Sequence, residues 1–498
     1  MNDGNNIKVD RGNMFDKEDE RERIYESIFQ NSDQRKPQFI CATQPLALLL
    51  SRDSFLCFDG DDLGLYYPWR GVHEENNYEN NHLDEEFKKF LRSKDAFSVP
   101  PIQEQRRLIL LYISNIYPFY PVVDRKSLDD IKSIPLILLN AIFLSAIRFD
   151  SLQNEKDIRP RLHHFYQRCK QLELLETNKI TLIQSYLLLS MHEEGINGAT
   201  SSKEYVTKAC NLCGELAITN ISGSNGISMS SNQADHLHSS FKKVLYGKNF
   251  LRRLFWVSFC CDRLVSATCG REMYYNVADL MIDELTLIDF NEGEYQQSDY
   301  MIFRSWIRIC RLIDRIQCSL YRPPKNRTTN DWTLEEDLFS FVIDDANLIE
   351  VKFQKFLLLS HAYVCILYLR SKVDAMSLMV NSIELSGEQV KSRGNYIDQI
   401  HYYSSEIVEI AESTEVIHHI LVVHAIVHVI ALMQLESKTY INERDKAKTN
   451  FGLYFSEMMN RCAALLERSR GYWWFAGSAL RLCKVIFSYD DSVSHKIQ

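Results

Sequence analysis

Residues 251–285 read LRRLFWVSFCCDRLVSATCGREMYYNVADLMIDEL, and this stretch indicates the fold of the chain. Apolar and small side chains recur there three or four residues apart, at Leu251, Leu254, Phe255, Ser258, Cys261, Leu264 and Val265. That period places them on one face of a helix. On such a helix Cys260, Cys261 and Cys269 are interpreted as small core residues and not as a redox site. The stretch therefore predicts a structural helix packed in a core.

Four charged residues lie in the apolar part of this stretch, before Gly270. Arg252 and Arg253 lie near the expected start of the helix, where the helix dipole does not favour cations, so we expect them to have carboxylate partners or solvent. Asp262 and Arg263 are neighbours that diverge around a helix, so we expect them to bond to other segments and not to each other. If that network is buried, removing one charge costs about 3–5 kcal/mol.

The composition of the chain favours an all-α protein, a multi-helix array. The 498 residues include 45% hydrophobic residues but only 18 Gly and 11 Pro, too few for a β-sandwich or barrel with many tight turns. The net charge of −9 excludes a general basic field for nucleic acid. Thirteen cysteines without disulfide-framework spacing, and an N-terminus unlike a secretory signal, indicate a reducing intracellular compartment.

The hydrophobic pattern divides the chain into segments. Helical spacing runs from Leu108 to the prolines at 118 and 121, and helices are also predicted over 135–149, 180–195 (ended by Gly195) and 306–324. The expected organisation is a mobile tail over 1–36, an irregular segment over 37–94, a helical domain over 95–295 with a disordered insertion at 220–240, and a helical continuation over 296–498 with a polar linker at 371–399.

The stretch VIHHILVVHAIVHVIALM, residues 416–433, has no formal charge and about the length that spans a membrane. It contains four histidines, at 418, 419, 424 and 428, and ionisable groups are rare inside membranes. We therefore predict a helix buried in the protein. His424 and His428 also lie on one helix face, as zinc ligands do, but the glutamate of an HExxH motif and a third ligand are missing, which favours polar residues hydrogen-bonded in a core.

Other candidate sites have weaker sequence signals. Cys210 and Cys213 form an isolated CxxC inside a helical pattern, so core packing is favoured over zinc or redox chemistry. The acidic turn Asp59-Gly-Asp61-Asp62 lacks the remaining positions of a calcium loop. MHEEG, residues 191–195, is interpreted as a solvated helix end. DLMIDELTLIDFNEGEY, residues 279–295, alternates acidic and apolar residues and is interpreted as an ordered connection with wet carboxylates, although activation segments show a similar pattern. GxSxG, GxGxxG, P-loop and HExxH motifs are absent from the sequence.

Four stretches, in order, resemble the fungal-specific transcription factor domain, the middle homology region of binuclear zinc cluster regulators. They are LYISNIYPFYPVVDRKSL (111–128), LILLNAIFLSAI (136–147), FYQRCKQLELLETNKITLIQSYLLLSMHEEG (165–195) and the opening stretch (251–285). The IQSYLLLS segment is most similar to the cutinase and fatty-acid-utilisation regulator subgroup. The residues that match the family signature are Arg253, Trp256, Asp262, Arg263, Gly270 and Arg271.

The sequence departs from the family in two places. Glu272 replaces the proline of the family's Gly-Arg-Pro turn, which leaves that turn looser. The six-cysteine zinc cluster that gives the family its DNA binding is missing, since residues 1–94 contain only Cys41 and Cys57. We therefore expect no direct DNA binding and no zinc in this chain, which is either a product lacking its N-terminal part or a regulator that acts through partners.

The resemblance implies a nuclear, non-enzymatic regulatory portion of an RNA polymerase II transcription factor. Its partners would be related regulators, in homo- or heterodimers, the transcription machinery, and a small-molecule inducer held between helices. Two alternatives stay open: an interaction partner without its own DNA-binding module, and an all-α enzyme with His424 and His428 as its only seed. Catalytic, cofactor-binding and metal-ligating residues are not assigned, and target genes, inducer, direction of regulation and oligomeric state are not encoded in a readable motif.

Overall fold

The computed structural model describes thirteen parts of the chain, and the predicted all-α class is confirmed. The described residues are 38–41, 64–67, 85–150, 152, 155–216, 218–220, 239–280, 282–290, 296–323, 331–380, 387–413, 418–441 and 448–483. The predicted mobile tail (1–36), the acidic turn at 59–62 and most of the predicted insertion (221–238) lie outside them.

Helix α9 (Ser239–Cys269) contains most of the opening stretch and runs for 31 residues. It packs against α8 (Gly198–Glu215) and α10 (Gln296–Ile316). The prediction that Arg252 and Arg253 lie near the start of the helix was wrong, because α9 begins twelve residues before Leu251, in the largely polar sequence SSFKKVLYGKNF. Both arginines therefore lie in the middle of the helix, where the dipole of its N-terminus has little influence.

The segments before α4 contain two short strands and a helix. Strand β1 (Gln38–Cys41) pairs antiparallel with β2 (Gly64–Tyr67), with Gln38 opposite Tyr67. Helix α3 (Glu85–Ser93) follows, within the segment that the sequence pattern described as irregular.

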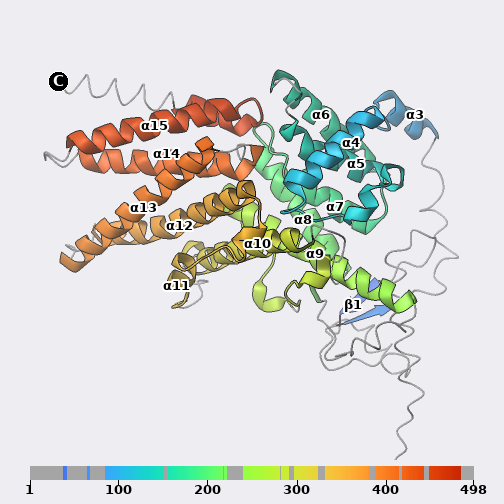
Figure 1. Ribbon diagram of the computed structural model, residues 1–498, viewed down its shortest axis with the longest axis horizontal. Coiled ribbons are helices and arrows are strands. Elements are labelled where there is room, and N and C mark those ends of the chain that lie inside the picture. Colours follow the sequence, from blue (N-terminus) through green and yellow to red (C-terminus); the bar gives the residue numbers. More distant parts are fainter. Residues whose placement is uncertain are drawn as a thin grey trace, which may run out of the picture.

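The first group of helices surrounds an almost fully buried one. Helix α5 (Leu136–Ala146) is buried from Ile137 to its end, as its uniformly apolar sequence predicts. Around it pack α4 (Ile102–Leu111), α6 (Glu155–Leu172) and α7 (Lys179–Leu189), which lie together in Figure 1.

The ends of these helices follow local chemistry. Asn178 caps α7 by accepting hydrogen bonds from the backbone N–H of Ile180 and Thr181 at 2.9 and 3.2 Å. The predicted end of this helix at Gly195 was wrong: α7 ends at Leu189, and Gly195 takes a positive φ of 75° in the loop that follows. A π-helical turn, η1 (Tyr112–Ile116), continues α4 and stops just before Pro118, as predicted.

The remaining helices form a second group on the other side of α9 and α10 (Figure 1). They are α11 (Leu334–Phe339), α12 (Val351–Val380), α13 (Gly387–Ser413), α14 (Ile420–Ile441), α15 (Lys448–Ser469) and a last helical segment at 474–483. The prediction of a polar linker at 371–399 was wrong for the residues that the structure describes there. Residues up to Val380 belong to α12, and those from Gly387 onward belong to α13. Their polar residues lie on long helices and not in a connection.

Short single-turn helices connect the longer ones: η2 (Arg125–Leu128), η3 (Ile131–Ser133), η4 (Ile147–Phe149), η5 (Ile218–Asn220), η7 (Val277–Asp279), η8 (Leu287–Phe290), η9 (Gln317–Tyr321) and η11 (Ala346–Leu348).

One hydrophobic core extends from Leu108 to Cys483 and joins the two groups. Phe119, from the first group, lies 5.6 Å from the ring of Trp306 in α10, 4.8 Å from Phe356 in α12 and 5.9 Å from His419. One described helical stretch, Val351–Asp374, is long and apolar enough to cross a membrane, and 72% of its apolar window is buried inside the protein. The histidine-rich run that raised the membrane question forms the start of α14 and is largely buried.

Candidate functional site

The signature residues of α9 form a buried polar network. Arg253 is 1% exposed, and its guanidinium donates to the backbone oxygens of Pro121 (3.1 Å) and Asp289 (2.9 Å) and to the carboxylate of Asp124. Arg252 donates to the Asp289 carboxylate at 2.8 Å. The predicted carboxylate partners of both arginines are therefore confirmed.

Asp289 corrects the interpretation of segment 279–295, whose carboxylates were expected to stay in water. Its carboxylate is buried and also accepts hydrogen bonds from the backbone N–H and the hydroxyl of Thr286. Burial raises its pKa, which the Thr286 hydrogen bonds and the Arg252 charge partly offset. Trp256 donates from Nε1 to the backbone oxygen of Asp283 at 3.0 Å, so α9 binds this segment at two points.

Asp262 and Arg263 contact each other, which the sequence reasoning excluded. Arg263 Nη1 lies 2.6 Å from Asp262 Oδ2, because the long arginine side chain folds back along the helix. The predicted bonds to other segments are also present: Lys203 of α8 lies 2.8 Å from Asp262, and Asp314 of α10 lies 2.8 Å from Arg263. Both residues are fully buried.

The turn after α9 depends on the same pair. The backbone N–H groups of Tyr274 and Tyr275 donate to the Asp262 carboxylate, and Arg263 donates to the Tyr275 oxygen at 2.8 Å. Gly270 has φ = +63°, a conformation that favours glycine, and places Arg271 so that its N–H reaches the Ser266 oxygen at 3.2 Å. Arg271 itself is exposed.

The cysteines of the sequence motifs are packed in the core, as predicted. Cys210, Cys213, Cys260 and Cys261 are buried, and burial raises the pKa of each thiol. Cys269 is only partly buried, and burial raises its pKa to about 11. Such thiols are poor nucleophiles and poor metal ligands. Within the described parts of the chain, no group of three or more His, Cys, Asp or Glu side chains is arranged to hold a metal ion.

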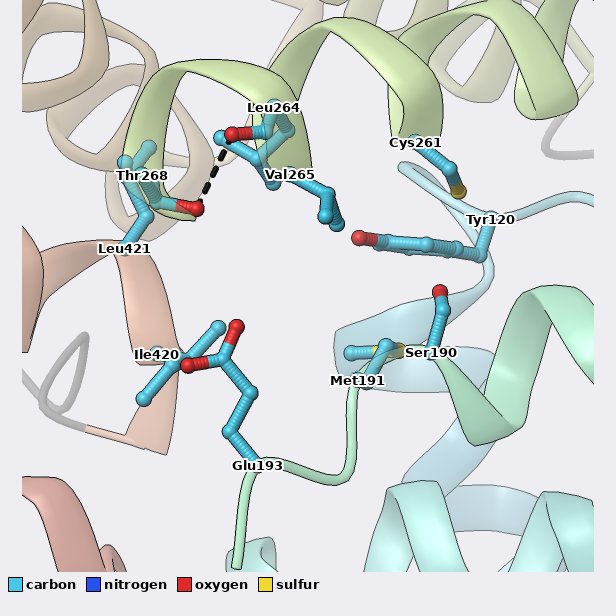
Figure 2. A pocket seen from close by; sticks show the side chains of 10 residues that line it. All are labelled: Tyr120, Ser190, Met191, Glu193, Cys261, Leu264, Val265, Thr268, Ile420 and Leu421. Carbon is cyan, nitrogen blue, oxygen red and sulfur yellow. Dashed lines mark hydrogen bonds between the residues drawn. The ribbon is translucent and has the colours of Figure 1, made fainter. Parts of the chain in front are cut away.

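A small cavity lies between α9, the loop after α7 and the start of α14 (Figure 2). Its free volume is about 10 Å³, close to that of one water molecule. Polar atoms face apolar walls in this space. The lining residues are Tyr120, Ser190, Met191, Glu193, Cys261, Leu264, Val265, Thr268, Ile420 and Leu421. We call this cavity the α9–α14 pocket.

Glu193 dominates the chemistry of the α9–α14 pocket. Its carboxylate points into the pocket in Figure 2, and its Oε2 lies 3.1 Å from Nε2 of His424 on α14. Both side chains are 7% exposed. The interpretation of MHEEG as a solvated helix end was therefore wrong for His192 and Glu193, which are buried because the C-terminal helices cover this loop.

A buried arginine lies beside Glu193. Arg148 of η4 stacks over the ring of Trp473 at 3.8 Å and donates to the Tyr472 oxygen at 3.4 Å. Burial lowers its pKa to about 9, although Glu194 and Glu193 partly restore it. The adjacent imidazole of His192 lies 3.4 Å from Arg148, and burial together with this cation holds its pKa well below the usual range.

The predicted pair of histidines is divided between two environments. His424 reaches Glu193, whereas the Nδ1 atom of His428 lies 3.2 Å from the backbone oxygen of His424, and its ring meets Tyr363 of α12 edge-on at 5.2 Å. Burial lowers the pKa of His428 to about 4. The expectation that these residues are hydrogen-bonded within a helical core is confirmed.

The α9–α14 pocket is a polar space between two parts of the fold. A carboxylate and the hydroxyls of Tyr120, Ser190 and Thr268 face aliphatic side chains there, and the free volume of about 10 Å³ holds a single water and no larger molecule unless a wall moves. Sequence reasoning missed this site because Glu193 and His424 are 231 residues apart, and only MHEEG carried a usable signal.

Comparison with known proteins places these features in a family. Residues 109–316 match the family described as fungal specific transcription factor domain. The chain is 26% identical over 250 residues to cutinase transcription factor 1 alpha of Fusarium vanettenii, covering 46% of this chain and 26% of that protein. It is 25% identical over 232 residues to the acetamidase regulatory protein of Aspergillus fumigatus, covering 45% of this chain and 28% of that protein.

A third relative, transcription factor cpaR of Aspergillus oryzae, is 26% identical over 218 residues, covering 40% of this chain and 33% of that protein. The similarity thus spans about a quarter to a third of each relative's length. The resemblance read from the sequence, including that to the cutinase-regulator subgroup, is confirmed.

Proposed function

Because residues 109–316 are a fungal specific transcription factor domain, we propose that this chain is the regulatory portion of a fungal RNA polymerase II transcription factor. In this proposal it acts in the nucleus, is not an enzyme, and controls transcription through partners without reading DNA itself. The family match carries the proposal, and the regulator names of the relatives support it.

The signal in this proposal is a small-molecule inducer or a partner protein. The α9–α14 pocket can take an inducer only if one of its walls moves, because its free volume of about 10 Å³ holds a single water; its buried carboxylate and aliphatic walls then offer orientation and apolar contact. A related regulator, in a homo- or heterodimer, supplies the second. An inducer acts only if it binds two states of the domain with different affinity.

A tethering experiment tests the function. The full chain is fused to an unrelated DNA-binding domain in a fungal host, and a reporter gene with the matching sites is measured against the DNA-binding domain alone. We expect the reporter to change several-fold in either direction and a fluorescent fusion to collect in the nucleus. An unchanged reporter together with cytoplasmic fluorescence contradicts the proposal.

The same strain distinguishes the proposed function from the alternative in which the chain acts only as a partner of a related regulator. If the chain works only as a partner of a related regulator, the tethered chain changes the reporter only when that relative is present, and the two proteins co-purify. Activity in the absence of any related regulator contradicts this alternative.

A further inference from the structure

We propose that the Glu193–His424 contact is a latch that seats the C-terminal helices α14 and α15 on the family domain and closes the α9–α14 pocket at the same time. The regulatory meaning of the latch rests on the proposed function, but its existence as a structural device does not.

The Glu193 side of the contact is fixed to the family domain. Glu193 lies in the short loop between α7 and α8, and this loop packs closely against Gly198, the first residue of α8. A Cβ atom added at Gly198 would lie 2.9 Å from the backbone carbon of Glu193, so the loop packs directly against the start of α8. Ser190, at the start of the loop, donates to the Leu187 oxygen at 2.7 Å and accepts on its backbone oxygen from Ser202 of α8.

The His424 side belongs to a different unit. Helix α14 packs mainly on α12, α13 and α15, and its first turns reach the family domain through side chains. Besides the Glu193 contact, the ring of His424 lies tilted at 4.8 Å from the ring of Phe475, and His418 lies 4.5 Å from the ring of Tyr472. The start of α14 and residues 472–475 thus approach the family domain together.

Because the α9–α14 pocket is small, a molecule that binds in it must move the first turn of α14. The free volume of about 10 Å³ accepts a single water, so any larger occupant must displace a wall. One side of the pocket comes from α9 and the loop after α7, within the family domain, whereas Ile420 and Leu421 come from the first turn of α14. An occupant that takes the Glu193 carboxylate removes the hydrogen-bond partner of His424 and pushes on the same turn. Both effects loosen α14.

Hydrogen–deuterium exchange of the full chain tests the latch. The unlatching variants are Glu193→Met, which keeps the length of the side chain without a strong acceptor, and His424→Leu. The matched control is His428→Leu, an imidazole on the same helix that faces α12. In both unlatching variants we expect exchange at 190–198 and at 420–434 to rise together by about tenfold or more, since a buried hydrogen-bonding group loses its partner. Exchange in α5 stays as in the wild type, and His428→Leu leaves 190–198 unchanged.

A pocket-filling variant tests the link to the pocket. Val265→Phe adds a ring to a space that holds one water, and we expect it to raise exchange at 420–434 while α5 stays protected. Uniformly faster exchange, or no change in these segments, overturns the latch. Neither result depends on transcription, so failure of the latch and failure of the proposed function are distinguishable.

Discussion

Replacing Asp262 by Asn tests whether the signature network of α9 stabilises the fold. The carboxylate is fully buried and meets four donor groups: Lys203 Nζ at 2.8 Å, Arg263 Nη1 at 2.6 Å, and the N–H groups of Tyr274 and Tyr275 at 2.8 and 3.1 Å. The amide of Asn keeps one acceptor oxygen and turns its NH₂ toward these donors. Several of them therefore lose their acceptor.

The expected loss is about 3 kcal/mol of unfolding free energy. Removing one partner of a buried ion pair costs about 3–5 kcal/mol, because the other charge is left without compensation. Arg263 keeps Asp314 at 2.8 Å and the Tyr275 oxygen, which places the expectation at the lower end of that range. Lys203 is the matched control: its side chain is 19% exposed, and without it the Asp262 carboxylate keeps Arg263 and two backbone N–H donors, so Lys203→Met costs about 1 kcal/mol or less.

Urea denaturation followed by tryptophan fluorescence measures both variants. A double-mutant cycle with Arg263→Met gives a second readout. We expect the double variant to lose less than the sum of the two single variants, because the Asp262–Arg263 contact is removed only once. If the unfolding free energy of Asp262→Asn stays within about 0.5 kcal/mol of the wild type, the network does not stabilise the fold. The usual penalty for a buried charge without its partner then does not apply here.

Three further predictions concern buried groups and one turn. Burial raises the pKa of Asp299 to about 6, so the folded state binds its proton more tightly than the unfolded state, and stability falls as pH rises from about 4 to about 6; Asp299→Asn flattens this part of a urea-midpoint profile, and an unchanged profile contradicts the assignment. Burial lowers the pKa of His419 to about 3, so stability falls by up to about 1.4 kcal/mol per pH unit as pH drops below 6.5; His419→Phe reduces that slope, and a slope equal to the wild type contradicts it. Gly270→Ala costs about 1 kcal/mol through its positive φ alone, since its Cβ meets open space, and a neutral result in the same assay shows that the turn relaxes.

Sequence reasoning predicted those parts of the fold that depend on local chemistry. The uniformly apolar run of α5 and the stop before Pro118 are such cases, because burial on all sides and a missing N–H are properties of the residues themselves. The start of α9 was missed for the opposite reason. Its first twelve residues are largely polar and contain Gly247, so their helical state is not visible in a hydrophobic period.

Contacts between distant residues account for the other errors. The rule that helix neighbours diverge describes Cβ positions, and Arg263 is long enough to return to Asp262. The sequence interpretation placed Glu193 in solvent because its partner, His424, lies on a helix that begins more than 220 residues later. Burial of such a loop depends on which helices cover it, and only the three-dimensional arrangement supplies that information.

The chemistry of the signature residues explains why this fold keeps charged side chains inside its longest described helix. The segment around Pro121 and the segment around Asp289 are not strands or long helices, so their backbone oxygens need donors from elsewhere. Arg253 supplies them from one planar group with five N–H donors, which a lysine could not do in the same geometry. Asp262 performs the converse task for the N–H groups of Tyr274 and Tyr275. The signature therefore fixes loops to α9. One of these loops, bound at Pro121 by Arg253, carries Tyr120, which lines the α9–α14 pocket on the same helix.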